Sequence, residues 1–295
     1  MSIIVRMKGG LGNQLFQWAF ARSISSRLKT SYLIDWAPFS PEFKVHKYSL
    51  DHFAIKVPLA TNTDMFGFVW IGRHYKFFNT FYHLMRFRRV LMPFYYPERT
   101  FVFDPVAFSK TGTTYFDGFW QTEKYFKNIA DEIRAELTLV EPLSPYSKKI
   151  EEEIQSTPNA VSLHVRRADL VHNPVMTAFH GYCSPEFYAA AIKRVVKDMP
   201  SPHFFIFSDD YEWVVGHFKS MPYPYTCIKN GANKNYEDLY LMSRCCRHII
   251  SNSSFGWWGA WLNPKKDKMV IAPSKWFVTT KNDTKDLLPE GWIKI

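Results

Sequence analysis

The stretch LHVRRADL, residues 163–170, places two adjacent arginines directly after an apolar run. Side chains alternate along an extended segment, so His164 and Arg166 are expected on the face opposite Leu163. Arginine is costly to bury without an anion, and its planar fork matches two oxygens of a diphosphate, which lysine cannot copy. The sequence therefore predicts Arg166 as an anion ligand at the carboxyl end of a strand, where open α/β sheets bind ligands.

The same motif has a structural alternative. In it the motif forms an ion-pair cluster at the strand end with a structural role only. Where Arg166 binds a ligand, Arg167 points the opposite way and can be neutralised by Asp169, two residues on. The spacing alone leaves both interpretations open.

A serine-rich turn is the second candidate anion site. Residues 251–254, SNSS, follow an apolar strand and precede a helix-like run. Hydroxyl groups and unpaired N–H groups, including those of Ser253 and Ser254, would converge there, and the helix dipole favours a negative charge. An ordinary N-cap is the alternative, because serine is common at that position in any protein.

The loop KGGLGNQ near the start of the chain is the third candidate. Gly10 and Gly12, followed by Asn13, stand between a strand and a helix, so backbone N–H groups can approach a phosphate. The dinucleotide fingerprint fails because its third glycine is Leu15, and a phosphate-binding Walker loop fails because no Gly-Lys-Ser/Thr is present. A plain tight turn is an equal alternative.

Acidic and metal-ligating patterns are weaker. Asp209 and Asp210 can hold a divalent metal, but adjacent acids after a strand more often cap the next helix, which we favour. The set His172, His180 and Cys183 does not form a convincing zinc site.

Strand-like and helix-like segments alternate and must position these groups. We expect strands at 2–7, 160–165, 203–207, 247–250 and, as the last one, 269–272, and helices at 13–28, 184–198, 236–244 and 255–262. This alternation indicates parallel, doubly wound sheets. The segment EPLSPYS, residues 141–147, marks a boundary. We therefore predict an α/β protein with two Rossmann-like domains, residues 1–143 and 144–295.

Composition limits the class of protein. The chain has 295 residues and a formal net charge of +10, which favours anionic partners. The four cysteines show no disulfide or zinc spacing, and no apolar stretch approaches the ~18 residues of a membrane span, so we expect a cytoplasmic protein.

Residues 65–96 hold twelve aromatic and five basic residues but no acid. They predict either peripheral contact with an anionic membrane or an ordinary aromatic insertion.

At this point the chain resembles the bacterial α-1,2-fucosyltransferases, the HxRRxD-containing inverting enzymes of glycosyltransferase family 11. The resemblance rests, in order along nearly the whole chain, on GGLGNQLFQWAFARSIS, HVRRAD, HGYCSPEFY, FSDD, DLYLMSRCCRHIISNSSFGWWGAWL and LLPEGWIKI. It implies a GT-B architecture, with two Rossmann-like domains facing across a cleft, and metal-independent transfer of L-fucose from GDP-β-L-fucose to a galactose 2-hydroxyl.

The resemblance also implies roles for single residues. Arg166 would hold the β-phosphate, His164 would lie against the nucleotide and Asp238 would bind the guanine edge. Ser253 and Ser254 would hold the diphosphate, with the glycine loop and its Asn13 near the donor from the N-terminal, acceptor-side domain. For a base, Asp169, His172 and Glu186 are the candidates, and the choice among them stays open. A loose, oxocarbenium-like transition state would need no strong base, and Asp169 would then only orient Arg167.

Other functions compete with this one. A basic protein that binds nucleic acid or a membrane surface without catalysis would also carry positive charge and aromatic residues, although it has no need for three anion sites at strand ends. We expect no nucleic-acid partner. Within enzymes, a transferase with another GDP-sugar or another acceptor hydroxyl is the main alternative.

Overall fold

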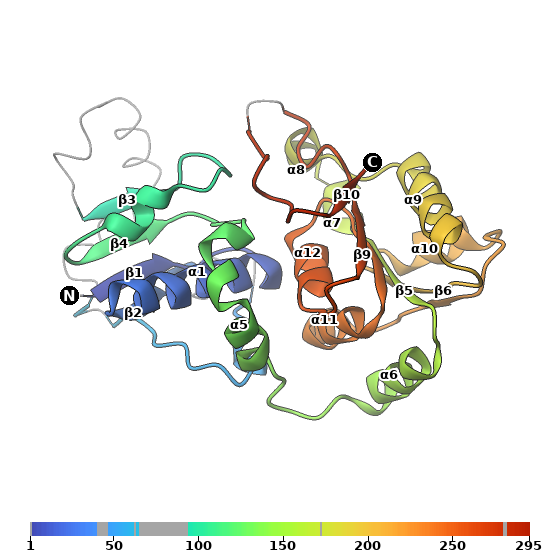
Figure 1. The fold of residues 1–295 in the computed structure, drawn as a ribbon, viewed down its shortest axis with the longest axis horizontal. Coiled ribbons are helices and arrows are strands. Elements are labelled where there is room, and N and C mark those ends of the chain that lie inside the picture. Colours follow the sequence, from blue (N-terminus) through green and yellow to red (C-terminus); the bar gives the residue numbers. More distant parts are fainter. Residues whose placement is uncertain (1, 40–46, 62, 65–93, 172, 280–281) are drawn as a thin grey trace. The chain divides into compact units, whose positions relative to one another are not determined.

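The computed structural model describes residues 2–39, 47–61, 63–64, 94–171, 173–279 and 282–295 (Figure 1). The chain forms two compact units. Unit 1 comprises Met1–Thr138 and Lys285–Leu287, and unit 2 comprises Leu139–Thr284 and Leu288–Ile295. Each unit contains one parallel sheet with packed helices. The predicted α/β class with parallel sheets is therefore confirmed.

Unit 1 is built on a four-stranded sheet in the order β2-β1-β4-β3. Its strands are β1 (Ser2–Arg6), β2 (Ser31–Asp35), β3 (Tyr95–Pro97) and β4 (Thr114–Asp117), and the α-helices among its described residues are α1 (Leu11–Leu28) and α5 (Ala130–Glu136). Helix α1 packs on β1 and β2. Its buried Phe20 stacks on Trp120 at 4.1 Å between ring centroids, so aromatic side chains fill much of this core.

Unit 2 is built on a six-stranded sheet in the order β10-β9-β8-β5-β6-β7. The strands are β5 (Ala160–Val165), β6 (His203–Ser208), β7 (Tyr225–Cys227), β8 (Arg247–Ile249), β9 (Met269–Ala272) and β10 (Ile293–Lys294). The helices are α6 (Pro145–Ser156), α7 (Ala168–Val171), α8 (Pro174–His180), α9 (Pro185–Asp198), α10 (Tyr211–Phe218), α11 (Asn235–Arg244) and α12 (Ser254–Trp261). The strand order reverses between β5 and β8, as in dinucleotide-binding sheets.

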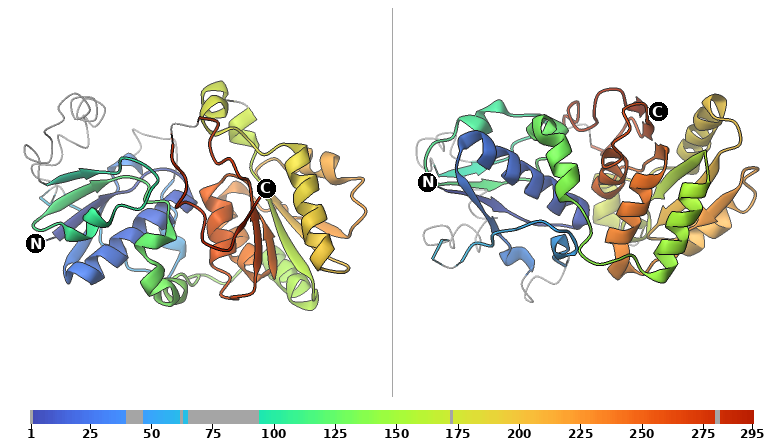
Figure 2. Two further views of the ribbon diagram at one scale, coloured as in Figure 1. Left: turned by 45° about the horizontal axis from the view of Figure 1, so that its top comes forward. Right: turned by 60° about the horizontal axis from the view of Figure 1, so that its bottom comes forward.

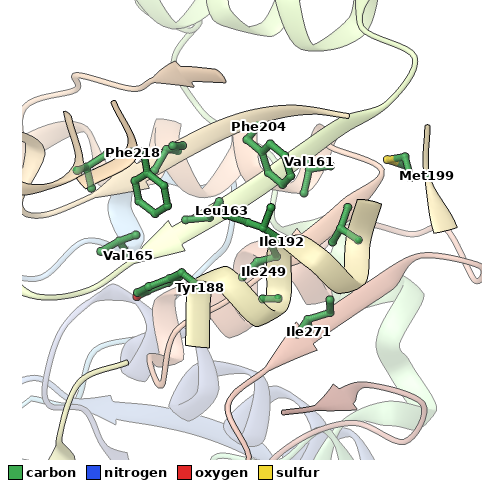
Figure 3. Close-up of a cluster of buried hydrophobic side chains, with 14 residues drawn as sticks. Val161, Leu163, Val165, Tyr188, Ile192, Met199, Phe204, Phe218, Ile249 and Ile271 are labelled. Atoms are coloured by element: carbon green, nitrogen blue, oxygen red, sulfur yellow. The ribbon is translucent and has the colours of Figure 1, made fainter. Parts of the chain in front are cut away.

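Strand β5 has two different faces. Val161, Leu163 and Val165 pack with Tyr188 and Ile192 of α9 in one apolar cluster (Figure 3). On the other face lies a second cluster, which joins Ala160 and residues of β6 to side chains of α6 and α11. His164 is on this second face, as the alternation predicts, and its ring meets Phe255 of α12 at 5.5 Å.

Most predicted elements are present, with shifted ends. Helix α1 begins at Leu11, two residues before the expected start, and α12 begins at Ser254. The predicted 269–272 strand is present, but it is not the last one, because β10 follows it (Figure 2). Part of the segment expected as a linker is helix: Pro145 opens α6, and Oγ of Ser144 accepts from the backbone N–H of Ser147.

Residues 65–93 of the aromatic and basic segment lie outside the described residues. Its last residues, Tyr95 and Tyr96, are buried in β3. Among the helices that the structure describes, none has the length and apolarity required to cross a membrane.

Candidate active site

The candidate site of unit 2 lies at the carboxyl edge of its sheet, where β5 and β8 end side by side. Arg166 directly follows β5, and the turn at residues 251–254 follows β8 and leads into α12. These are the neighbouring strands at which the strand order reverses, the place where open α/β sheets hold ligands. Two of the three predicted anion-binding segments therefore meet at one point of the fold.

His164 is fixed in this edge by three contacts. Its Nδ1 lies 2.9 Å from Oγ of Ser251, and its ring packs on Phe255. Gly256 of α12 leaves room for the imidazole, since a Cβ there would be 2.6 Å from Nδ1. Burial, together with the positive charge of Arg166, lowers the pKa of His164 to about 3. The imidazole is therefore neutral near pH 7 and serves as a hydrogen-bonding group.

The two arginines of the motif have different surroundings. Arg166 is partly exposed and close enough to His164 for its charge to lower the pKa of the histidine. Arg167 forms an ion pair with Asp210, with 3.4 Å between Nε and Oδ2, and its guanidinium lies 4.7 Å from the ring centroid of Trp213. The structure thus pairs Arg167 with Asp210. The side chain of Asp169, the partner suggested from the sequence, lies outside the described part of the chain.

The acids that follow β6 organise the backbone at this edge. Oδ1 of Asp209 accepts from the backbone N–H groups of Arg167 at 2.8 Å and Ala168 at 3.2 Å. Asp210 caps α10 through the N–H of Trp213. The capping role favoured from sequence is confirmed for Asp210. Among the described residues, no group of three or more His, Cys, Asp or Glu side chains is placed to hold a metal ion.

The start of α12 is anchored from both sides. Nδ2 of Asn252 donates to the carbonyl oxygens of His180 at 2.8 Å and Trp276 at 3.2 Å. Oγ of Ser253 accepts from the N–H of Phe255 at 3.3 Å, so its own proton is left to donate. Ser254 is the first helical residue and is partly exposed. The helix therefore presents donors at a rigid end.

Asp238 lies in the first turn of α11, which begins after β7 and so starts at the same edge of the sheet. Its Oδ1 accepts from Nδ2 of Asn230 at 2.7 Å, and that amide also donates to Oγ of Ser147 at 3.0 Å. Burial raises the pKa of the Asp238 carboxyl to about 7. Asn230, which the sequence analysis did not single out, fixes this carboxylate.

The glycine that the loop of unit 1 requires for its backbone conformation is Gly9, which the sequence did not single out. Gly9 has φ +85°, and a Cβ there would lie 2.5 Å from Nδ2 of Asn13. Gly10 is the N-cap of α1 and Gly12 is buried in its first turn. Oδ1 of Asn13 accepts from Nε2 of Gln121 at 2.7 Å, which ties the loop to the segment after β4.

Comparison with known proteins decides the family. Residues 80–295 match the family described as Glycosyl transferase family 11. The chain belongs to glycosyltransferase family 11. Over 300 residues it is 32% identical to an alpha-1,2-colitosyltransferase of Escherichia coli, with 100% of this chain and 99% of the relative covered. It is 30% identical to the O-antigen biosynthesis glycosyltransferase WbnK of Escherichia coli, covering 98% and 99%.

The fold of this family 11 chain is also similar to solved structures. The fucosyltransferase NodZ from Bradyrhizobium matches with a TM-score of 0.51 and 16% identity, covering 89% of this chain and 93% of that one. A variant of Arabidopsis thaliana FUT1 in complex with GDP matches with a TM-score of 0.52 and 9% identity, covering 98% and 75%. At such identities the likeness concerns the fold alone.

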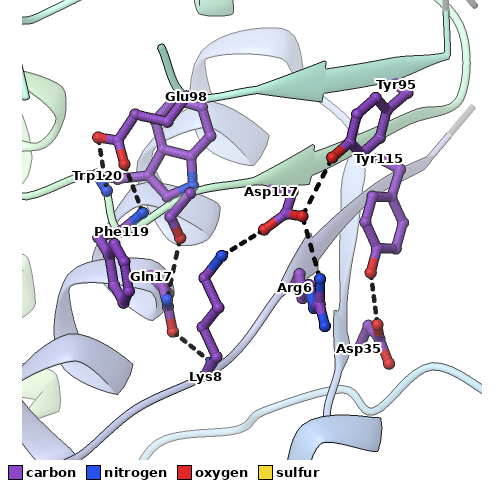
Figure 4. Close-up of polar contacts among 11 residues, drawn as sticks. Arg6, Lys8, Gln17, Asp35, Tyr95, Glu98, Tyr115, Asp117, Phe119 and Trp120 are labelled. Carbon is purple, nitrogen blue, oxygen red and sulfur yellow. Dashed lines mark hydrogen bonds and ion pairs between the residues drawn. The ribbon is translucent and has the colours of Figure 1, made fainter. Parts of the chain in front are cut away.

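Unit 1 of the family 11 chain also contains a charged cluster at its carboxyl edge that sequence reasoning missed (Figure 4). Asp117, the last residue of β4, pairs with Arg6 at 3.2 Å and with Lys8 at 2.6 Å. Burial opposes the charge of Asp117, but the two cations outweigh it and lower the pKa of the carboxyl. Burial raises the pKa of nearby Glu98 to about 7.

The three residues predicted as candidate bases lie in different surroundings. Asp169 belongs to α7 by its backbone, and nothing is described of its side chain, while His172 lies outside the described residues. Glu186 is exposed in the first turn of α9, where a hydrogen bond from Ser184 lowers the pKa of its carboxyl and so weakens it as a base.

Proposed function

We propose that this family 11 glycosyltransferase moves L-fucose from GDP-β-L-fucose to the 2-hydroxyl of a galactose in an oligosaccharide or glycolipid, with inversion at the fucose carbon. The observation that carries the proposal is the meeting of Arg166, neutral His164 and the start of α12 at the reversal point of the unit 2 sheet. A diphosphate is the donor part that such an edge accommodates best.

The chemistry follows from the charge that develops. When the bond between the sugar C1 and the diphosphate oxygen breaks, the bonding electrons stay on the diphosphate. Arg166 offers a bidentate grip on the β-phosphate, and Ser253, Ser254 and the N–H groups of α12 add fixed donors. Groups placed in advance around this growing charge lower the barrier more than they stabilise the bound donor. Positive charge from these groups makes a metal unnecessary in this proposal.

The other donor contacts are proposals as well. Asp238, held by Asn230, would accept from the N–H groups on the guanine edge, which UDP does not offer. Nδ1 of His164 would accept from Ser251, so that Nε2–H donates to the nucleotide. We further propose a GT-B arrangement, in which unit 2 holds the donor, unit 1 the acceptor, and Gly10, Gly12 and Asn13 approach the donor across the cleft.

GDP-colitose is a second candidate donor. It is favoured by the relative named an alpha-1,2-colitosyltransferase, which is 32% identical over the full chain. Colitose is 3-deoxy-L-fucose, so the two donors differ only in one hydroxyl group. A site that hydrogen-bonds this hydroxyl would reject colitose strongly, whereas a site that only tolerates it discriminates weakly.

One experiment separates these possibilities. Purified protein is incubated with lactose and an equimolar mixture of GDP-fucose and GDP-colitose, and the products are analysed by mass spectrometry and by NMR of the new linkage. An α-1,2-fucosylated product is expected. A colitosylated product in excess selects the second candidate, and a different linkage or no product from either donor refutes the proposed reaction on this acceptor.

We also propose that the protein acts at the inner face of the membrane, where residues 65–96 would make peripheral contact with acidic lipids. This proposal predicts pelleting with anionic liposomes at low salt. A protein that stays in the supernatant under those conditions would remove it.

A further inference from the structure

Unit 1 contains a cavity of about 250 Å³ that the proposed donor contacts do not use. It lies beyond the carboxyl ends of β3 and β4. Its lining comes from the segment that follows β3, including Glu98, Thr100 and Asp104, and from the segment that follows β4, including Trp120 and Tyr125. All the lining residues belong to unit 1. The cavity is therefore formed by one unit alone.

The backbone at this cavity is held in an unusual conformation. Trp120 has φ +56°, in the left-handed region that bulky side chains rarely adopt. Glu98 enforces it, because its two carboxylate oxygens accept from the backbone N–H groups of Phe119 at 2.6 Å and Trp120 at 3.0 Å (Figure 4). Gly118 is required beside it, since a Cβ there would lie 2.4 Å from Cβ of Glu98. Strain of this kind persists where the surroundings over-determine it, often at ligand sites.

The polar groups of the wall are likewise fixed. Oη of Tyr96 donates to Oδ2 of Asp104 at 2.5 Å, and Oη of Tyr125 accepts from the backbone N–H of Asp104 at 3.0 Å. Trp120 is packed between Phe20 at 4.1 Å and Tyr96 at 6.4 Å, ring centroid to ring centroid. The cavity thus combines aromatic surface with oriented carboxylates and a hydroxyl, a preorganised mixture that suits a polyhydroxylated ligand.

Charge and size narrow the ligand further. The lining holds the carboxyl groups of Glu98 and Asp104 and one guanidinium, that of Arg99. Because burial raises the pKa of Glu98 to about 7, these groups carry little net charge near neutral pH, which favours an uncharged ligand over a diphosphate. The volume is below the ~300 Å³ at which sites for drug-sized ligands begin. It is therefore suited to one sugar ring and too small for an oligosaccharide.

We propose that this cavity is the subsite for one neutral pyranose of the acceptor, with Glu98 and Asp104 as acceptors for its hydroxyl groups. The inference rests on the proposed transferase function, which it deepens by naming where the acceptor sugar is held. None of the cavity's lining residues is among the proposed donor contacts, so substitutions in the cavity change the use of the acceptor and leave GDP binding unchanged.

Thr100→Trp tests the proposal, because Thr100 is an exposed residue at the cavity and a large ring there fills it without removing a buried contact. Val102→Trp fills the cavity from a second lining position, which is partly exposed, and replaces the first variant if that variant does not fold. Thr113→Trp is the matched control, an exposed position just before β4, at the opposite end of the strand. Thermal unfolding and GDP affinity establish that each variant is intact.

The probes are methyl β-D-galactopyranoside and lactose at millimolar concentration. Saturation-transfer NMR without donor is expected to show both binding to the wild type and to Thr113→Trp, and neither to a folded cavity-filling variant. The KM for lactose should rise about tenfold or more in that variant while the KM for GDP-fucose stays the same.

The outcomes keep this inference apart from the proposed function. An unchanged lactose KM in a folded cavity-filling variant overturns the inference while the transferase function stands. Failure of both probes to bind the wild type also overturns it. If no transfer is found with any donor, but sugar binding is present and is abolished by filling the cavity, the inference is supported while the proposed reaction fails.

Discussion

Nδ1 of His164 lies 2.9 Å from Oγ of Ser251, and this contact joins the end of β5 to the turn after β8. The imidazole is neutral near pH 7 because burial and the charge of Arg166 lower its pKa to about 3. A neutral ring presents one N–H and one acceptor, and the partner of Nδ1 decides which nitrogen faces the ligand. Ser251 is therefore expected to act by positioning His164.

Ser251→Ala is predicted to lower kcat/KM about fivefold, the effect of one hydrogen bond of about 1 kcal/mol. The ¹⁵N chemical shifts of the imidazole should show Nε2–H in the wild type and a mixture of tautomers in the variant. Ser243→Ala, which removes a hydroxyl bonded to the backbone of α11, is the control. Unchanged imidazole shifts in Ser251→Ala would refute the positioning role.

Asp238 predicts a pH dependence of GDP binding. Burial raises the pKa of its carboxyl to about 7, and the ionised form is the better acceptor for guanine N–H groups. Binding would then release a proton, so GDP affinity should rise with pH up to about 7 and level off above it. Calorimetry of GDP and UDP at several pH values measures this.

Asp238→Asn should remove that pH dependence and weaken GDP more than UDP. Asp267→Asn, on the loop before β9, is a control. Equal losses for both nucleotides would place Asp238 outside the base-binding site.

Full activity in EDTA is predicted. The acids after β6 are already engaged, Asp209 by the backbone of Arg167 and Ala168 and Asp210 by α10 and the Arg167 side chain. We assign the positive charge that neutralises the diphosphate to Arg166 and to the N-terminal end of α12 instead. Initial rates with and without chelator, followed by addition of Mg²⁺ or Mn²⁺, check this. A strict dependence on either metal would move the chemistry toward Asp209 and Asp210.

His248 predicts how stability depends on pH. It is fully buried, with Nδ1 at 2.7 Å from Oγ of Ser162 and Nε2 at 2.9 Å from Nδ2 of Asn263. Burial lowers its pKa from 6.5 to about 3. A group with a depressed folded pKa contributes stability above its unfolded pKa and loses it as pH falls, by about 1.4 kcal/mol per pH unit.

The comparison uses His248→Gln. The gap in unfolding free energy between wild type and this variant should be largest at pH 7.5 and narrow below about pH 6. Urea denaturation at pH 7.5, 6 and 5 measures it. A constant gap across this range would show that the protonation of His248 is not coupled to folding.

The sequence predicted best where a pattern is local. The helix capped by Ser184 and the strand at residues 269–272 follow from capping and apolar runs. The strand has the expected bounds, and the helix begins at Pro185, directly after its cap. The alternation of side chains along β5 correctly predicted that His164 and Leu163 lie on opposite faces of the sheet. The ion pair of Arg167 with Asp210 was missed, because it depends on β5 and β6 lying side by side.

Other features required tertiary structure. Glu98 directly follows β3, a strand of only three residues at the end of the aromatic segment, where no alternation of apolar and polar residues marks a strand. The backbone N–H groups that donate to Glu98 belong to Phe119 and Trp120, in the segment after β4. Gly9 is required because its φ of +85° lies in the left-handed region, a backbone property that the letters KGGLGNQ do not assign to one glycine.

The most direct test of the account compares the affinities of GDP and GMP for the wild type and for Arg166→Lys. The difference between the two ligands isolates the β-phosphate, which Arg166 is proposed to hold in a bidentate grip. The wild type should prefer GDP, and the variant should lose about 2–3 kcal/mol of that preference, with a similar loss in turnover. Arg194→Lys, at a helix position paired with Asp198, is the matched control. An undiminished preference for GDP in Arg166→Lys would contradict the proposed donor site.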